Sequence, residues 1–201
     1  MRFLVVFCHP SRDSFGGALH DLTCRTLAAA GHETRVRDLY GEGFDPVLTR
    51  EEWDRYLADP QANIEAQAGH VADLQWCEGL IVIYPTWYYG PPAMLKGWLE
   101  RVWLPGVTFE IPKSLVSRPT GKLRNVRIFL GITTSGSPWW WLRLIGDPGR
   151  SLWTRGLRPI FHPRCRYLWR QLHSMNHRTD ADRAAFLARV ESTLRGLGRA
   201  A

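Results

Sequence analysis

Long hydrophobic runs are missing from this sequence of 201 residues. A membrane-spanning helix needs about 20 consecutive apolar residues, and no segment comes near that length. The opening run from Phe3 to Cys8 is too short for a signal-peptide core, and His9 and Pro10 follow it at once. We therefore expect neither a targeting signal nor a membrane span.

Cysteine is also scarce, with only Cys8, Cys24, Cys77 and Cys165 in the chain. None of them forms a CxxC pair, and four scattered thiols are too few for a disulfide framework or a zinc site. The sequence therefore predicts no metal site. It also favours a reducing, cytoplasmic location.

Acidic residues are rare in the second half of the chain. Residues 1–110 hold 9 Lys and Arg against 15 Asp and Glu, whereas residues 111–201 hold 17 against 4. Nucleic acid is a possible partner for such a basic half. The arginines are scattered among Trp, Pro and Gly rather than aligned on one helix face, so we expect no nucleic-acid binding. An attraction for a small anionic ligand is the simpler use of this charge.

Strand and helix patterns alternate along the chain. Buried apolar runs predict strands at 2–7, 79–84 and 126–132, and residues 33–39 can form another. A fifth strand at 157–162 is weakened by neighbouring prolines. Helical spacing follows from Phe15, over 64–76, from about residue 91, at 149–156 and after Thr179, while 41–60 reads as irregular. This alternation predicts one α/β domain over 1–201, a three-layer sandwich whose five-stranded parallel sheet carries helices on both faces.

Three loops follow strand carboxyl ends, at 8–14, 84–91 and 133–141. Ligands of parallel α/β sheets bind at this edge, where the strand order reverses. In the first loop, the free N–H groups at the start of a helix favour an anion. Ser11 and Ser14 add hydroxyl groups, His9 and Arg12 can add charge, and Gly16 and Gly17 permit close approach. A simple helix cap explains the same residues equally well.

The second loop is unusually aromatic. Trp87, Tyr88 and Tyr89 follow a buried strand directly, and exposed aromatic clusters normally have a partner. A planar aromatic ligand held by stacking is one such partner. A subunit interface or an extension of the core is the alternative.

The run from Tyr84 to Val102, YPTWYYGPPAMLKGWLERV, resembles the signature of the NAD(P)H:quinone oxidoreductase family. His9 with Ser14 and Phe15 resembles the phosphate-binding turn of that family, and residues 133–136 resemble its third flavin loop. The resemblance spans nearly the whole chain. It implies a flavodoxin-like fold with strand order 2-1-3-4-5, FAD or alternatively FMN as cofactor, NAD(P)H as co-substrate and a homodimer.

The resemblance also implies roles by position. The flavin would be contacted by His9, Ser11, Ser14, Phe15, Gly16, Pro85, Thr86, Trp87, Tyr88, Tyr89, Thr133, Thr134, Ser135 and Gly136. Backbone N–H groups of 86–89 and 134–137 are the candidate donors to its pyrimidine edge. Lys96 and Arg101 lie on the following helix and are expected to be solvated or ion-paired. The flavin would pass two electrons from NAD(P)H to a quinone or similar small aromatic acceptor.

One departure from the family concerns proton relay. Members close to the animal enzymes carry a Tyr and a His after the third loop, whereas residues 137–147 here contain neither. His162 and His173 are possible substitutes, and solvent is another proton source. Trp139, Trp140 and Trp141 occupy this stretch instead, and we expect them to wall the acceptor pocket. A dimer interface and a transient membrane contact are the alternatives for these three residues.

Two rival functions remain open. A flavodoxin-like electron carrier would share the fold, but such carriers are usually acidic and need no nicotinamide pocket. A flavin-binding regulatory or ancillary subunit would keep the fold without turnover. The sequence does not separate FAD from FMN or NADH from NADPH.

Overall fold

A computed structural model describes residues 1–112, 114 and 120–198 of the chain. Its strands are β1 (Arg2–Phe7), β2 (Glu33–Asp38), β3 (Gly79–Pro85), β4 (Phe109–Glu110), β5 (Thr120–Gly121), β6 (Ile128–Thr134) and β7 (Arg166–Leu172). Its α-helices are α1 (Phe15–Ala29), α2 (Arg50–Ala58), α3 (Pro60–Ala66), α4 (Ala68–Trp76), α5 (Ala93–Val102), α6 (Trp139–Leu144), α7 (Pro148–Ser151) and α8 (Asp180–Arg195).

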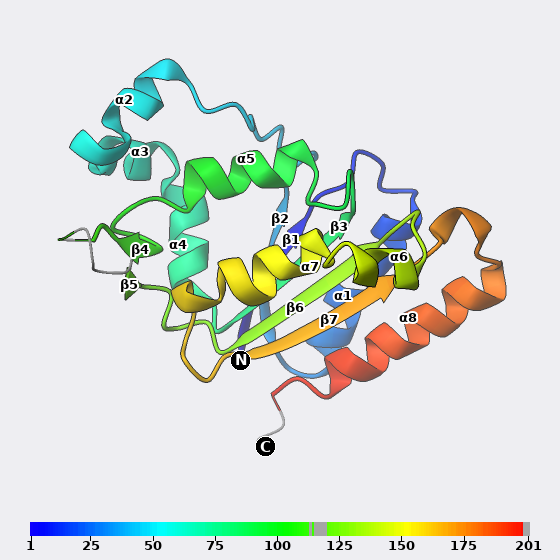
Figure 1. The fold of residues 1–201 in the computed structure, drawn as a ribbon. Coiled ribbons are helices and arrows are strands. Elements are labelled where there is room, and N and C mark those ends of the chain that lie inside the picture. The colour runs from blue at the N-terminus through cyan, green and yellow to red at the C-terminus, as the bar shows by residue number, and fades with distance from the viewer. Residues whose placement is uncertain (113, 115–119, 199–201) are drawn as a thin grey trace.

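Five strands form one parallel sheet, as expected (Figure 1). Its order by element number is β2-β1-β3-β6-β7, not the expected 2-1-3-4-5. The numbers differ because β4 and β5 pair with each other in a separate antiparallel ribbon. The order reverses between β1 and β3, which pair in register from Phe3 with Gly79 to Phe7 with Ile83. The expected ligand edge therefore lies at the carboxyl ends of these two strands.

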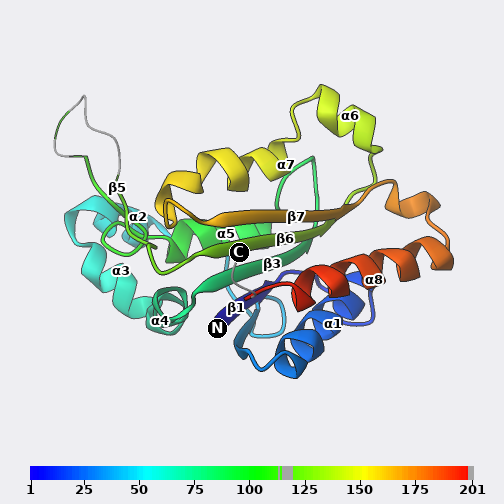
Figure 2. The ribbon, with the colours of Figure 1, turned by 90° about the horizontal axis from the view of Figure 1, so that it is seen from below.

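Alternate residues of β1 point to opposite faces of the sheet, as the strand period of two requires. Phe3, Val5 and Phe7 pack in a core with residues of α1 and α8, whereas Leu4 and Val6 pack in a second core with residues of α4 and α5. Figure 2 shows α1 and α8 side by side on one face. Both faces are thus covered, which explains the almost continuous burial of β1, β3 and β6.

Three expected elements differ in the structure. Residues 41–60 are not irregular throughout, since Thr49 and Glu52 form a capping box that starts α2, and Pro60 opens α3 as its first residue. The helix expected over 64–76 is divided at Gln67 into α3 and α4. The strand expected at 157–162 is wrong: residues 158–160 form a 3-10 turn, and the fifth strand of the sheet is β7.

His70 of α4 contacts a side chain of α5 and one of the loop after β2. Its Nδ1 accepts a hydrogen bond from Trp98 Nε1 at 3.2 Å, and its ring meets Phe44 edge-on at 5.2 Å. Burial, assisted by the nearby Arg37, lowers the pKa of His70 from 6.5 to about 4. The unfolded chain therefore binds a proton that the folded chain excludes between these two values.

We expect the free energy of unfolding to fall as the pH drops from about 6.5 towards 4. Urea titrations at pH 7, 5.5 and 4.5 measure the loss. A His70→Gln variant cannot take up this proton and should show a smaller loss over the same window. A variant with the same pH profile as the original chain would contradict this assignment.

Candidate functional site

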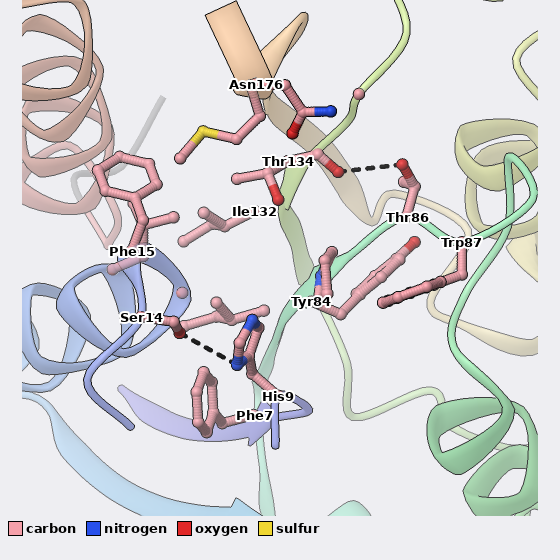
Figure 3. A pocket seen from close by; sticks show the side chains of 16 residues that line it. Phe7, His9, Ser14, Phe15, Tyr84, Thr86, Trp87, Ile132, Thr134 and Asn176 are labelled. Carbon is pink, nitrogen blue, oxygen red and sulfur yellow. Dashed lines mark hydrogen bonds between the residues drawn. The ribbon is translucent and has the colours of Figure 1, made fainter. Parts of the chain in front are cut away.

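A pocket of about 360 Å³ lies at the carboxyl edge of the sheet, where the strand order reverses. It is lined by Phe7, His9, Ser14, Phe15, Gly16, Leu19, Ile83, Tyr84, Pro85, Thr86, Trp87, Ile132, Thr134, Gly136, Met175 and Asn176. These residues come from the carboxyl ends of β1, β3 and β6, from the loops that follow them and from the start of α1, and Met175 and Asn176 come from the segment after β7. Figure 3 shows Phe15 on one side of the pocket and Tyr84 with Trp87 on the other.

Nine of the expected site residues line the pocket: His9, Ser14, Phe15, Gly16, Pro85, Thr86, Trp87, Thr134 and Gly136. Five others lie beside it. Ser11 is exposed, and its backbone N–H donates to His9 Nδ1. Tyr88 is 98% exposed, and the Tyr89 hydroxyl instead accepts a hydrogen bond from Trp141 Nε1.

Thr133 and Ser135 are the remaining two, and both are buried. Ser135 Oγ donates to the Ser137 carbonyl and accepts from the Ser137 N–H, both at 3.1 Å, which fixes the turn of the third loop. Thr133 Oγ1 has no hydrogen-bond partner in the part of the chain that the structure describes. These two residues shape the loop from behind the pocket wall.

Hydrogen bonds around Ser14 hold the first loop. Ser14 Oγ accepts the Gly17 N–H at 3.2 Å as the cap of α1, donates to the Ser11 carbonyl at 2.7 Å and lies 3.1 Å from His9 Nδ1. A Cβ on Gly17 would lie 1.8 Å from the Arg12 carbonyl oxygen, so only glycine lets the loop close against the helix. These hydrogen bonds therefore fix the orientation of the Ser14 and His9 side chains, both of which line the pocket at the start of α1.

Arg12 does not supply charge to this pocket, contrary to expectation. Its guanidinium group pairs with Asp21 at 3.1 Å and Asp38 at 3.5 Å and lies over the Phe7 ring. Two carboxylates neutralise it outside the pocket wall. The positive end of α1 and the His9 ring remain as the features that suit an anion there.

The second loop contains a strained two-residue turn. Trp87 and Gly90 bond to each other through both backbone pairs at 2.9 Å, which leaves Tyr88 and Tyr89 at the tip with φ of 46° and 67°. Bulky residues rarely adopt this left-handed conformation. The other non-glycine residues with positive φ in the described part of the chain, Asp147 and Ser174, also follow β6 and β7 at this edge. Such strain typically gathers at functional sites.

Several backbone donors expected to face a ligand are already bonded within the protein. The N–H groups of Thr86, Trp87, Ser135 and Ser137 donate to Thr134 O, Gly90 O, Leu172 O and Ser135 Oγ respectively. Thr86 Oγ1 also donates to the Thr134 carbonyl at 3.0 Å. This bond ties the second loop to the third, as Figure 3 shows. The expectation that these four N–H groups are free to donate to a ligand is therefore wrong.

The two histidines proposed as relay substitutes occupy opposite ends of β7. His162 precedes the strand; its N–H donates to the Val126 carbonyl and its carbonyl accepts from the Cys165 N–H. These contacts lie at the opposite end of the sheet from the ligand edge. His173 follows the strand directly, and burial lowers its pKa below the usual value. His173 is therefore the one on the correct edge, although it does not line the pocket.

Trp139, Trp140 and Trp141 form the first turn of α6, beyond the third loop. Trp139 and Trp140 are 62% and 56% exposed, and Trp141 holds Tyr89. None of the three lines the pocket described above. Trp139 lines a second hollow beside it. The role of this run in acceptor binding stays a prediction.

Lys96 and Arg101 are ion-paired, as expected. Lys96 pairs with Glu100 one turn along α5, and Arg101 Nε donates to Glu52 at 3.0 Å. Among the described residues, no group of three or more His, Cys, Asp or Glu side chains is placed to hold a metal ion. Within the same residues, no helix is long and apolar enough to cross a membrane.

Known proteins with similar sequences and structures include enzymes of nicotinamide chemistry. NAD(P)H dehydrogenase [quinone] 1 of Cavia porcellus is 29% identical over 152 residues, which cover 68% of this chain and 54% of that protein. An uncharacterized NAD(P)H oxidoreductase of Escherichia coli, YcaK, is 31% identical over 147 residues and 73% of each chain. The chain thus spans about half to three quarters of the curated relatives that it matches.

A solved structure agrees over the whole length. The NAD(P)H:quinone oxidoreductase of Methanothermobacter marburgensis superposes with a TM-score of 0.77 at 25% identity, covering 100% of this chain and 98% of that one. The family model for the flavodoxin-like fold matches residues 1–158. The parallel sheet, the reversal of strand order and the pocket at its carboxyl edge are those of this fold, and the chain belongs to the flavodoxin-like family.

Proposed function

We propose that this protein is a flavin-dependent NAD(P)H:quinone-type oxidoreductase that transfers two electrons to a quinone or a similar small aromatic acceptor. The observation that carries the proposal is one pocket at the reversal of strand order, walled by loops after four parallel strands. Relatives named as NAD(P)H dehydrogenases and oxidoreductases support the same chemistry.

The pocket fits a planar ring with a polar tail. Trp87, Tyr84 and Phe15 supply flat apolar surface, and Trp87 remains 61% exposed for contact. On the opposite wall, Gly16 leaves space because it has no side chain; a Cβ there would lie 3.2 Å from the His9 ring. The Ser14 and α1 end suits the anionic tail of a flavin nucleotide. We propose FAD as the cofactor, with FMN as the alternative.

The chain's own residues would bind and orient rather than react. A bound flavin supplies the hydride chemistry. Trp87 would fix the ring plane, and Asn176 offers a side-chain donor at the end of the pocket near Thr134 (Figure 3). Tyr84 keeps its hydroxyl proton because burial raises its pKa, and that hydroxyl accepts from Trp153 Nε1 at 2.9 Å. We propose that solvent supplies the proton to the acceptor.

One experiment tests the cofactor and the reaction together. The purified protein is examined for flavin absorbance, the released flavin is identified by chromatography, and NAD(P)H is added with and without menadione. We expect a yellow protein that NAD(P)H bleaches and menadione reoxidises. A colourless protein that refuses both FAD and FMN on reconstitution would refute the proposal.

The same measurements separate the two rival functions. An electron carrier would bind flavin but react sluggishly with NAD(P)H, and a regulatory subunit would bind flavin without turnover. Rapid reduction by NAD(P)H followed by multiple turnovers with menadione would exclude both.

Substituting Ser14 by Ala should weaken flavin binding and stability together. The change removes the cap of α1, which typically costs about 1 kcal/mol, and frees His9 from its contact with Ser14 Oγ. Thr179→Ala is the matched control because Thr179 caps α8 in the same way without lining the pocket. Chemical denaturation should show similar losses for both variants, and flavin titration should show weaker binding for Ser14→Ala alone. Equal flavin affinity in the two variants would argue against a binding role for Ser14.

We also propose a cytoplasmic homodimer. Val47, Trp53 and Leu57 are 64%, 61% and 65% exposed around α2, and a second subunit would cover such side chains. All four cysteines are free, which suits a reducing compartment. Light scattering of the purified protein measures the mass directly, and a monomer at micromolar concentration would refute the dimer.

A further inference from the structure

A second hollow of about 850 Å³ lies beside the first pocket, outside α6 and α7. It is lined by Trp139, Leu142, Arg143, Gly146, Asp147, Arg150, Ser151, Thr154, Arg155, Arg158 and His173. Four of these residues are arginines, and a single carboxylate accompanies them. The wall therefore carries a net positive charge that the first pocket does not use.

Within the described residues, the four guanidinium groups have no acidic partner. No ion pair joins Arg143, Arg150, Arg155 or Arg158 to a carboxylate in the residues that the structure describes, whereas ten other arginines there are paired. Asp147 is occupied otherwise, since its Oδ1 accepts the Arg150 N–H and caps α7. Arginines gathered around one hollow without counter-charge favour an anion, above all a phosphate, whose oxygens match the guanidinium fork.

Two loops connect the hollow with the first pocket. The loop after β6 lines the first pocket with Thr134 and Gly136 and reaches the hollow with Trp139. The loop after β7 lines the hollow with His173 and the first pocket with Met175 and Asn176. The Ser174 N–H donates to the Ser137 carbonyl and the Met175 N–H donates to the Ser135 carbonyl, which binds the two loops together. A ligand long enough to cross this shared wall could occupy both spaces.

We propose that the arginine-lined hollow binds the phosphorylated adenosine end of NADPH, and that the protein consequently prefers NADPH to NADH. This inference rests on the proposed function, which places the flavin in the first pocket; hydride transfer would then require the nicotinamide to lie against that ring. The 2′-phosphate distinguishes NADPH from NADH, and arginine is the residue that typically accommodates it. Trp139 presents an exposed indole at the rim against which an adenine ring can stack.

The flavin's own phosphates are the competing anion. They have a separate candidate position at the start of α1, where Ser14, His9 and Gly16 line the first pocket. The hollow lies on the other side of the third loop, with α6 and α7 as its walls. The arrangement therefore leaves the four arginines to the second nucleotide.

Binding of nucleotide fragments tests the proposal without any turnover. Isothermal titration compares adenosine 2′,5′-bisphosphate with adenosine 5′-monophosphate on the flavin-loaded protein. We expect the bisphosphate to bind at least tenfold more tightly, and we expect Arg150→Gln combined with Arg155→Gln to remove about tenfold of that preference. Arg164→Gln is the matched control, because Arg164 is an exposed arginine at the opposite end of β7.

Steady-state kinetics give the second readout. The ratio of kcat/KM for NADPH to that for NADH should fall about tenfold in the double variant and stay unchanged in the control. Equal binding of the two fragments by the original protein would overturn the proposal. So would loss of bound flavin in the double variant, or arginine-dependent sedimentation with phosphatidylglycerol vesicles in the absence of selectivity for the bisphosphate.

Failure of this inference is distinguishable from failure of the proposed function. A protein that binds flavin and reduces menadione with equal use of NADH and NADPH would refute only the role of the hollow. A protein that takes up no flavin would refute the proposed function. In that case, the same titration on the flavin-free protein would still report whether the arginines bind the bisphosphate.

Discussion

Gly17→Ala should abolish flavin binding and destabilise the protein by more than a typical core substitution. The new Cβ would lie 1.8 Å from the Arg12 carbonyl oxygen and 2.7 Å from its carbonyl carbon, so the first loop and α1 must separate. Overpacking a rigid site costs about 1–3 kcal/mol and sometimes more, and here the obstacle is backbone. The same movement would carry Ser14 and His9 away from the pocket. Chemical denaturation and flavin titration measure the two effects.

Gly156→Ala is the control for this substitution. The nearest atom to its Cβ would be Leu152 Cδ1 at 3.8 Å, which is ordinary contact, and its φ is not positive. This variant should fold and bind flavin like the original chain. If Gly17→Ala matched it in both measurements, the close approach of Arg12 would have no part in shaping the pocket.

Trp153→Ala should cost about 3–5 kcal/mol of stability, as is usual for a large buried aromatic residue. Trp153 is fully buried, stacks on Phe129 at a centroid distance of 5.0 Å and meets Trp103 edge-on at 6.0 Å. Its Nε1 donates to the Tyr84 hydroxyl at 2.9 Å. Because Tyr84 lines the pocket, the loss should also loosen the flavin site. Urea unfolding at pH 7 measures the first effect.

Trp153→Phe separates packing from hydrogen bonding. It keeps an aromatic ring but leaves the buried Tyr84 hydroxyl without its donor, which costs about 1–3 kcal/mol. In Tyr84→Phe the Trp153 N–H loses its acceptor instead. The double variant should be less destabilised than the sum of the two single variants, because the hydrogen bond can be lost only once. Strict additivity would show that the bond contributes nothing.

The central sheet could be predicted because its strands are buried on both faces. β1, β3 and β6 read as short apolar runs, and the structure places strands at or within two residues of those positions. The position of α8 could also be predicted, since Thr179 and Asp182 form a capping box at its start. Local chemistry alone specifies these elements.

β7 lies at an edge of the sheet, and its position was not predicted. Its sequence, RYLWRQL, has only Leu172 fully buried, so it lacks the apolar run that marks the inner strands. The expected strand at 157–162 therefore lay too early in the chain. Because β7 was misplaced, the sequence analysis did not predict that the loop after it supplies Met175 and Asn176 to the pocket. Their contribution depends on tertiary pairing with β6 rather than on any local signal.

The other differences at the site concern hydrogen bonds, which a sequence pattern does not specify. The pattern identifies Arg12 as a charge near a helix start, but only the fold brings Asp38 within 3.5 Å of it. Likewise, the Thr86 N–H of the second loop donates to the Thr134 carbonyl of the third loop, and nothing in either loop alone indicates that hydrogen bond. Loop positions were therefore predictable, whereas the donors left for a ligand were not.

The turn at Tyr88 and Tyr89 also bears on how this protein would respond to directed evolution. Two-residue turns with positive φ at both positions favour Asn and Gly, so replacing Tyr88 with either should raise the melting temperature. A screen for heat resistance alone would therefore select such replacements early. Such a replacement would also remove an aromatic side chain that lies beside the pocket, so stability engineering should leave Tyr88 unchanged.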